Sequence, residues 1–181
     1  MKFNTEELLA DLTDRSKQAL ATISNYRSLD EASLNRKPHA GSWSKLECLE
    51  HLNLYGDFYL PEIERSILQA KRGFQPVFKS GVIGNYFAKL MQIKPDGTVK
   101  KMKSPADKNP AHSDLSVTTV ERFLKQQEQL LRLLEMAQKV DLKQSKTPIS
   151  ISKMIKLRLG DTLRFYVYHI ERHILQAEKI S

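Results

Sequence analysis

Four long segments repeat their apolar residues with the period of an α-helix, and this pattern limits the fold more than any other feature. They span about residues 4–26, 44–72, 117–140 and 161–179. Their apolar stripes include Leu8, Leu12, Ile23, Leu46, Leu49, Leu52, Ile63, Val120, Phe123, Leu134, Leu163, Ile170 and Ile174. Each stripe covers one helix face and must pack against the others. The sequence therefore predicts an all-α fold, a four-helix bundle in a single domain over residues 1–181.

Capping residues mark where the first two helices begin. Asn4 with Glu7, and Ser44 with Glu47, have the spacing of a capping box, in which each residue satisfies a backbone donor near the other. Pro61 lacks a backbone donor, so it should kink or interrupt the second helix, whose pattern stops by residue 73.

The connections differ in length. One turn of helix is predicted at 30–35 and a short helix at 83–91, inside a long connection over 74–115 that we expect to be functional or mobile. Asp161 is the predicted cap of the last helix. The run at 149–155 could pass for a strand but has no evident partner, and the sequence shows no β-hairpin signal.

The 181-residue chain carries a formal net charge of +8. Its lysines concentrate at 94–108 and 146–158, where no aromatic residues alternate with them as in a single-strand binding surface. We therefore expect a lysine-rich surface rather than a nucleic-acid site. The one cysteine, Cys48, the lack of an apolar leader and the lack of about 20 consecutive apolar residues indicate a soluble, cytoplasmic protein that does not enter membranes.

Three histidines form the candidate metal site. His169 and His173 are four residues apart, so they lie on one face of the last helix. Ile170 follows the first, which excludes the HExxH motif of zinc proteases, and such a pair can also arise by chance. His51 lies among apolar residues about seven positions into the second helix. It reaches the same depth as the pair if the two helices are antiparallel, although a parallel arrangement would also let them meet.

The order and spacing of these residues resemble the DinB/YfiT-like superfamily. Its members begin the second helix with W-S-x-x-E-x-x-x-H-L and end the fourth with H-x-x-x-H-x-x-Q. The matching residues here are Trp43, Ser44, Glu47, His51, Leu52, His169, His173 and Gln176. The resemblance implies a bundle in up-down-down-up order and one divalent metal ion held by His51, His169 and His173.

A metal with three imidazole ligands retains its full charge and an open position, as catalytic sites do. It can activate water, giving a hydrolase, or a low-molecular-weight thiol, giving a thiol S-transferase; relatives include proteins described as metal-dependent hydrolases and as bacillithiol S-transferases. Zinc, nickel and iron all suit these ligands. The predicted partner is a small-molecule substrate, and the resemblance also implies a homodimer. The alternative is a non-catalytic, metal-stabilised stress or interaction protein.

Other residues near the histidines have weaker claims. Glu47 lies one turn before His51 and Tyr55 one turn after it, and Gln176 could orient His173, so all three are candidates for the pocket or the second layer of ligands. Cys48 is more typical of a buried structural residue than of a fourth ligand. Arg172 should point about 100° away from His173, toward the surface or an interface. His39 and His112 lie in loops and receive no role.

Overall fold

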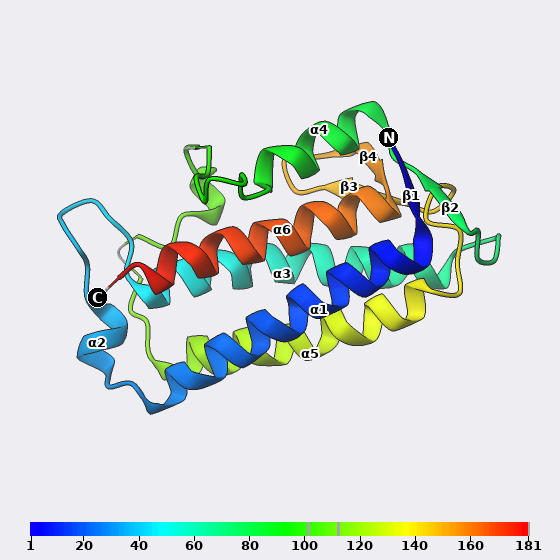
Figure 1. Ribbon diagram of the computed structural model, residues 1–181. Coiled ribbons are helices and arrows are strands. Elements are labelled where there is room, and N and C mark those ends of the chain that lie inside the picture. Colours follow the sequence, from blue (N-terminus) through cyan, green and yellow to red (C-terminus); the bar gives the residue numbers. More distant parts are fainter. Residues whose placement is uncertain (101, 112, 181) are drawn as a thin grey trace.

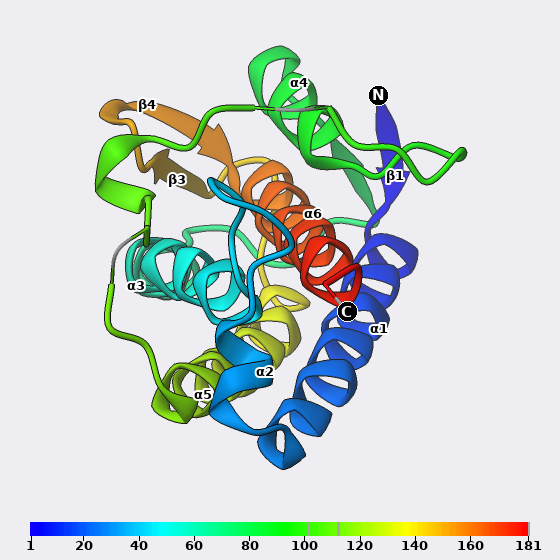
Figure 2. The ribbon, with the colours of Figure 1, turned by 90° about the vertical axis from the view of Figure 1, so that its left-hand side faces the viewer.

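The computed structural model describes residues 1–100, 102–111 and 113–180, and most of this chain is helical. Four long helices dominate it: α1 (Thr5–Ser24), α3 (Lys45–Leu68), α5 (Val117–Ala137) and α6 (Leu159–Glu178). α1 and α3 each pack against both α5 and α6 (Figures 1 and 2). The predicted all-α class is broadly confirmed, while the up-down-down-up order of a bundle stays a prediction.

The predicted caps of the first two long helices are present. The Asn4 side chain accepts hydrogen bonds from the backbone of Glu6 and Glu7, at 2.9 and 3.2 Å. Ser44 and Glu47 form a complete capping box: the Glu47 N–H donates to Ser44 Oγ at 3.1 Å, and the Ser44 N–H donates to Glu47 Oε2 at 2.8 Å. α3 therefore begins in the register that directs His51 inward.

Pro61 does not interrupt α3, which continues to Leu68 as one helix of 24 residues. Of the two predicted effects, an interruption is therefore wrong, and a kink at Pro61 stays a prediction. Proline removes one backbone hydrogen bond, but Tyr59, Leu60 and Ile63 on either side of it are almost completely buried. Their packing stabilises the helix across the missing bond.

The described residues also form two small antiparallel sheets of two strands each. β1 (Lys2–Asn4) pairs with β2 (Val77–Lys79), with Phe3 opposite Phe78, and β3 (Lys146–Ile149) pairs with β4 (Ser152–Arg158). The prediction of no β-hairpin is therefore wrong for residues 146–158. Pro148 makes the first strand hard to recognise in the sequence, because proline lacks a backbone donor. Proline is nevertheless tolerated at the edge of a two-stranded sheet.

Shorter elements cover the connections. The single turn α2 (Glu31–Asn35) follows the 3₁₀ helix η1 (Asn25–Ser28), and the 3₁₀ helix η2 (Ala106–Lys108) precedes α5. The predicted short helix is α4 (Val82–Met91), which packs along α6. The long connection over 74–115 is therefore partly structured and covers one side of α6.

Asp161 does not cap α6. The helix begins two residues earlier, and the fully buried Asp161 carboxylate accepts hydrogen bonds from the Ser80 hydroxyl and, at 2.8 Å, from the Gly81 N–H. Arg164 Nη1 lies 3.3 Å from the same carboxylate. A residue with the sequence signature of a cap thus joins α6 to the β2–α4 segment.

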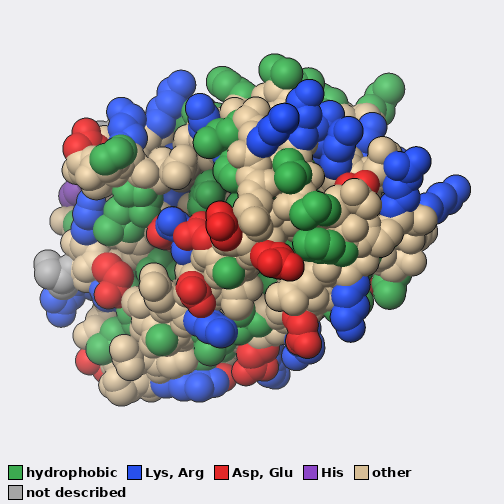
Figure 3. Space-filling view, turned by 45° about the vertical axis from the view of Figure 1, so that its right-hand side comes forward, with side chains coloured by type: hydrophobic (Ala, Val, Ile, Leu, Met, Phe, Trp, Pro, Cys, Tyr) green, Lys and Arg blue, Asp and Glu red, His purple; other side chains and the backbone are tan. Residues whose placement is uncertain are grey.

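The surface carries both signs of charge. Figure 3 shows one face on which Asp and Glu side chains lie among the Lys and Arg side chains. In the described part of the chain, no helix combines the length and apolar character needed to cross a bilayer.

Candidate metal centre

The structure brings together His51 of α3 with His169 and His173 of α6. One ligand atom from each ring lies within 4.8 Å of the others, and the residues are only 3, 4 and 9% exposed. His51 Nε2 and His169 Nε2 are 3.2 Å apart. Two imidazole nitrogens bound to one tetrahedral zinc ion would be roughly 3.3 Å apart, given zinc–nitrogen bonds of about 2.0–2.1 Å.

Hydrogen bonds fix the protonation of two of the rings. His51 Nδ1 lies 2.6 Å from the Lys108 carbonyl oxygen, and His173 Nδ1 lies 3.0 Å from Gln176 Oε1. Both oxygens can only accept, so each Nδ1 carries the proton. Each Nε2 is then left with a free lone pair, which is the form that binds a metal.

His169 shows why a cation fits between the rings. Its Nδ1 is buried and has no partner among the described residues, and its Nε2 faces the lone pair of His51 Nε2. If His169 Nδ1 carries the proton, the lone pairs of His169 Nε2 and His51 Nε2 face each other. If His169 Nε2 carries the proton, His169 Nδ1 is a buried acceptor without a donor among the described residues. A divalent ion bound by the rings would give the opposed lone pairs a common partner. The three-histidine group can therefore hold a metal ion.

All three imidazoles are held neutral by their surroundings. Burial lowers the pKa of His51 to about 4 and of His173 to about 3, and it lowers the pKa of His169 well below its usual value. The Arg172 charge lowers the pKa of each ring further. Neutral imidazole is the form required of a ligand, so at neutral pH no protons need to leave before metal binds.

These pKa values predict acid sensitivity of the metal-free protein. Each ring has a pKa near 6.5 in the unfolded chain, whereas in the folded chain the pKa is about 4 for His51, about 3 for His173 and lowered in the same direction for His169. The unfolded chain therefore binds more protons below pH 6.5. Stability is therefore full above about pH 6.5 and is lost as pH falls toward the folded values. Urea unfolding in EDTA at pH 7.5 and 5.5 should show a loss of roughly 1–4 kcal/mol. A His51→Leu/His173→Leu variant should lose less over the same range, and an equal loss would contradict this cause.

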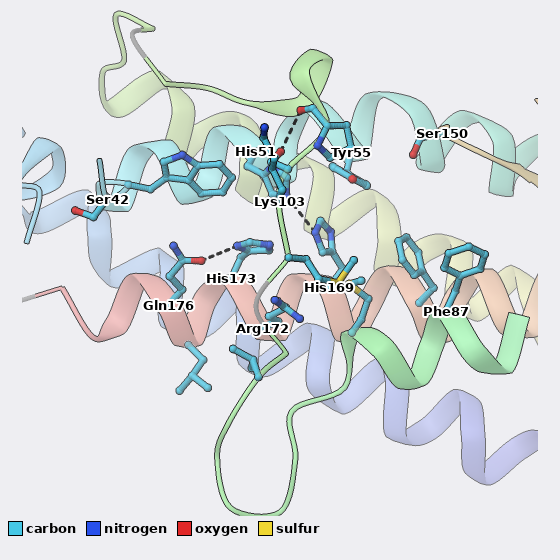
Figure 4. Close-up of a pocket in the computed structure, with 18 of the residues that line it drawn as sticks. Ser42, His51, Tyr55, Phe87, Lys103, Ser150, His169, Arg172, His173 and Gln176 are labelled. Atoms are coloured by element: carbon cyan, nitrogen blue, oxygen red, sulfur yellow. Dashed lines mark hydrogen bonds between the residues drawn. The ribbon is translucent and has the colours of Figure 1, made fainter. Parts of the chain in front are cut away.

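The histidines open onto a cavity of about 690 Å³ between α3, α6 and the connections that cover them (Figure 4). Aromatic rings form much of its wall: Trp43, Tyr55, Tyr59, Phe87 and Phe165. The Trp43 ring centre is 4.8 Å from that of His51, and the Tyr55 ring centre is 4.4 Å from that of His169. A largely apolar pocket of this size with a few convergent polar groups is typical of a small-molecule site.

A family model for the DinB superfamily matches residues 12–177 of the chain. The chain belongs to the DinB superfamily. No curated protein and no solved structure matches it significantly. The matched region includes both histidine-bearing helices, and the DinB assignment confirms the resemblance based on the two motifs.

The other predicted site residues of this DinB protein separate into two groups. Tyr55 lines the cavity, and Gln176 accepts the hydrogen bond from His173. Glu47 lies outside the cavity lining, and its carboxylate accepts from the Ser44 N–H and pairs with Lys37 Nζ at 2.7 Å. Cys48 is fully buried and is absent from the ligand group, so its position fits the structural role.

Arg172 is not on the surface, and that prediction is wrong. It is 8% exposed, lines the cavity beside the histidines and donates hydrogen bonds to the carbonyl oxygens of Leu90 and Lys100. Its side chain leaves α6 in a different direction from that of His173, as predicted, but the segment after α4 covers this face (Figure 4). His39 also lines the cavity, at its exposed edge, and His112 is outside the described residues.

Lys108 is the functional residue that the sequence did not indicate, since it acts through its backbone carbonyl. No side-chain pattern reports such a role. The length of the 74–115 connection was the only available signal.

Proposed function

We propose that this DinB-superfamily protein is a metal-dependent enzyme acting on a small molecule, with His51, His169 and His173 as its ligands. The observation that carries the proposal is the convergence of three buried, neutral imidazoles at the wall of a cavity of about 690 Å³. A closed structural site would have no need for such a cavity. One divalent ion per chain, zinc, nickel or iron, is the proposed cofactor.

A bound divalent ion supplies Lewis acidity that makes a water or a thiol nucleophilic at neutral pH. The surrounding residues would hold the ion and keep its ligands in position. The Lys108 carbonyl and Gln176 fix the rings of His51 and His173, and Tyr55 and Trp43 cover the site and limit the access of water. Hydrolysis and transfer of a low-molecular-weight thiol are the two proposed reactions. Among the described residues that line the cavity there is no carboxylate that could act as a general base in either reaction.

The proposed architecture is the four-helix bundle in up-down-down-up order, which the packing of α3 against α6 and of α1 against α5 supports. A homodimer in the cytoplasm is the proposed state. The intermixed charges of Figure 3 give little support to nucleic-acid binding.

Turnover tests the enzymatic proposal. The protein loaded in turn with zinc, nickel or iron should hydrolyse an ester or amide, or join a thiol to an electrophile such as a chlorinated nitrobenzene, in a mixed panel. Metal-free protein and His173→Gln should lose the activity by at least about 100-fold, because three ligands are needed to retain the ion. His39→Gln, at the exposed edge of the cavity, should keep it. Stable metal binding without turnover on any substrate would contradict an enzymatic role.

A specific observation supports the non-catalytic alternative. One ligand is on α3 and two are on α6, so an ion would join two helices of the core. Metal bound only to the folded chain raises the melting temperature by mass action. A large loss of melting temperature in chelator, together with no activity on the panel, would favour this structural role.

A further inference from the structure

The charged side chains known to line the cavity beside the histidines are all basic. Lys103, Arg172 and Lys179 line it, and no Asp or Glu is among the described lining residues. Figure 4 shows Lys103 and Arg172 near the histidines. Asp107, an acidic residue on η2, is largely exposed and lies 3.6 Å from Lys108 Nζ. Burial and the neighbouring Tyr59 raise the pKa of Tyr55 more than the Asp107 carboxylate does.

Arg172 is the buried member of this basic set. Its hydrogen bonds to Leu90 and Lys100 use two of its five N–H donors, and both acceptors are backbone carbonyls, which carry no charge. Arg164, eight residues earlier on α6 and also buried, shows the usual solution: it pairs with the Asp161 carboxylate at 3.3 Å. Among the described residues, Arg172 has no such acidic partner.

Charge balance then requires an anion. A divalent ion on three neutral imidazoles keeps two positive charges, and Arg172 adds a third in the same partly closed space. Buried charges without counter-charges are costly, so a ligand that brings negative charge is strongly favoured over a neutral one of equal shape. Arginine is also suited to a carboxylate, because its planar fork can donate two parallel hydrogen bonds.

We propose that the substrate of this site is a small carboxylate with an apolar or aromatic body, and that Arg172 binds its carboxylate. The body then lies against the aromatic wall formed by Tyr55, Phe87 and Phe165, and the exposed Lys103 and Lys179 attract the anion to the entrance. This inference rests on the proposed function for the choice of cavity, but the anion preference itself requires only Arg172.

Calorimetric titration with two probes of equal shape tests the proposal. 2-Naphthoate should bind the zinc-loaded protein at least about tenfold more tightly than 2-naphthamide, because only the first supplies a charge to Arg172. The preference should persist in metal-free protein, which separates it from direct binding of the carboxylate to the ion. Arg172→Gln should abolish it in metal-free protein and reduce it in zinc-loaded protein, where the charge of the ion remains, and the exposed Arg132→Gln, with the same change of charge on α5, should leave it unchanged in both forms.

Three outcomes would overturn the inference: equal binding of the two probes, a preference seen only with zinc bound, or a preference that survives Arg172→Gln undiminished in metal-free protein. Since Arg172 also fixes the loop after α4, circular dichroism and metal content are measured for each variant. If Arg172→Gln does not fold, Lys103→Gln/Lys179→Gln replaces it and should reduce the preference by about threefold at low salt; no reduction would count against the proposal. A chain that binds no metal but prefers the carboxylate would reject the proposed function and retain this inference.

Discussion

His51→Ala should reduce bound metal from about one ion per chain to less than about 0.1 after gel filtration, measured by elemental analysis. His51 is the only ligand supplied by α3, and its Nε2 lies 3.2 Å from that of His169. Without it, two histidines on a single helix remain, and a two-ligand site does not retain a divalent ion against washing. Loss of one of three ligands should therefore cost far more than the 10- to 100-fold typical of an outer hydrogen-bonding partner.

His39→Ala is the matched control for this loss. His39 lines the same cavity, but it is exposed, and its ring Nδ1 lies 3.1 Å from the carbonyl oxygen of the neighbouring Ala40. The His39→Ala variant should retain the metal ion completely. Since alanine leaves a space at a buried position, His51→Gln is measured beside it with the fold checked by circular dichroism. Folded His51 variants that retain metal, or wild-type protein that never takes one up, would contradict the proposed ligand set.

The convergence of the three candidate ligands could be predicted because helices place their side chains by simple rules. Four residues along α6 return to the same face, and the capping box at Ser44 fixes the register of His51. Arg172 shows where such rules end. Its angle on the helix was predictable, but its burial depends on where the distant residues Leu90 and Lys100 lie. A long connection contains no periodic pattern from which that position could be read.

The fold was predictable to a similar limit. The long helices follow from their apolar period, whereas β3 and β4 are short, contain Pro148 and depend on pairing with each other. Local sequence also gave the wrong role for Asp161. A helix-start aspartate looks the same in sequence whether it caps a helix or is buried against a distant segment, here Ser80 and Gly81.

Asp161→Ala should therefore destabilise the protein far more than loss of a cap, which costs about 1 kcal/mol. The substitution removes the acceptor for Ser80 and Gly81 and leaves the Arg164 charge buried and unpaired. Breaking a buried pair in this way costs about 3–5 kcal/mol, or a melting temperature lower by roughly 10 °C. Urea and thermal unfolding measure the loss. The exposed Asp14→Ala on α1 should stay within about 0.5 kcal/mol of the wild type.

The double variant Asp161→Ala/Arg164→Met distinguishes an unpaired charge from simple loss of packing. If the loss of stability in Asp161→Ala comes from the unpaired, buried charge of Arg164, removal of that charge should restore part of the stability. The double variant should then be more stable than Asp161→Ala alone. Metal content per folded chain should stay at the wild-type level in both, since Asp161 lies eight residues, or roughly 12 Å of helix, before His169. A double variant as unstable as the sum of its single changes would show that Asp161 acts through its neighbours in the β2–α4 segment and not through Arg164.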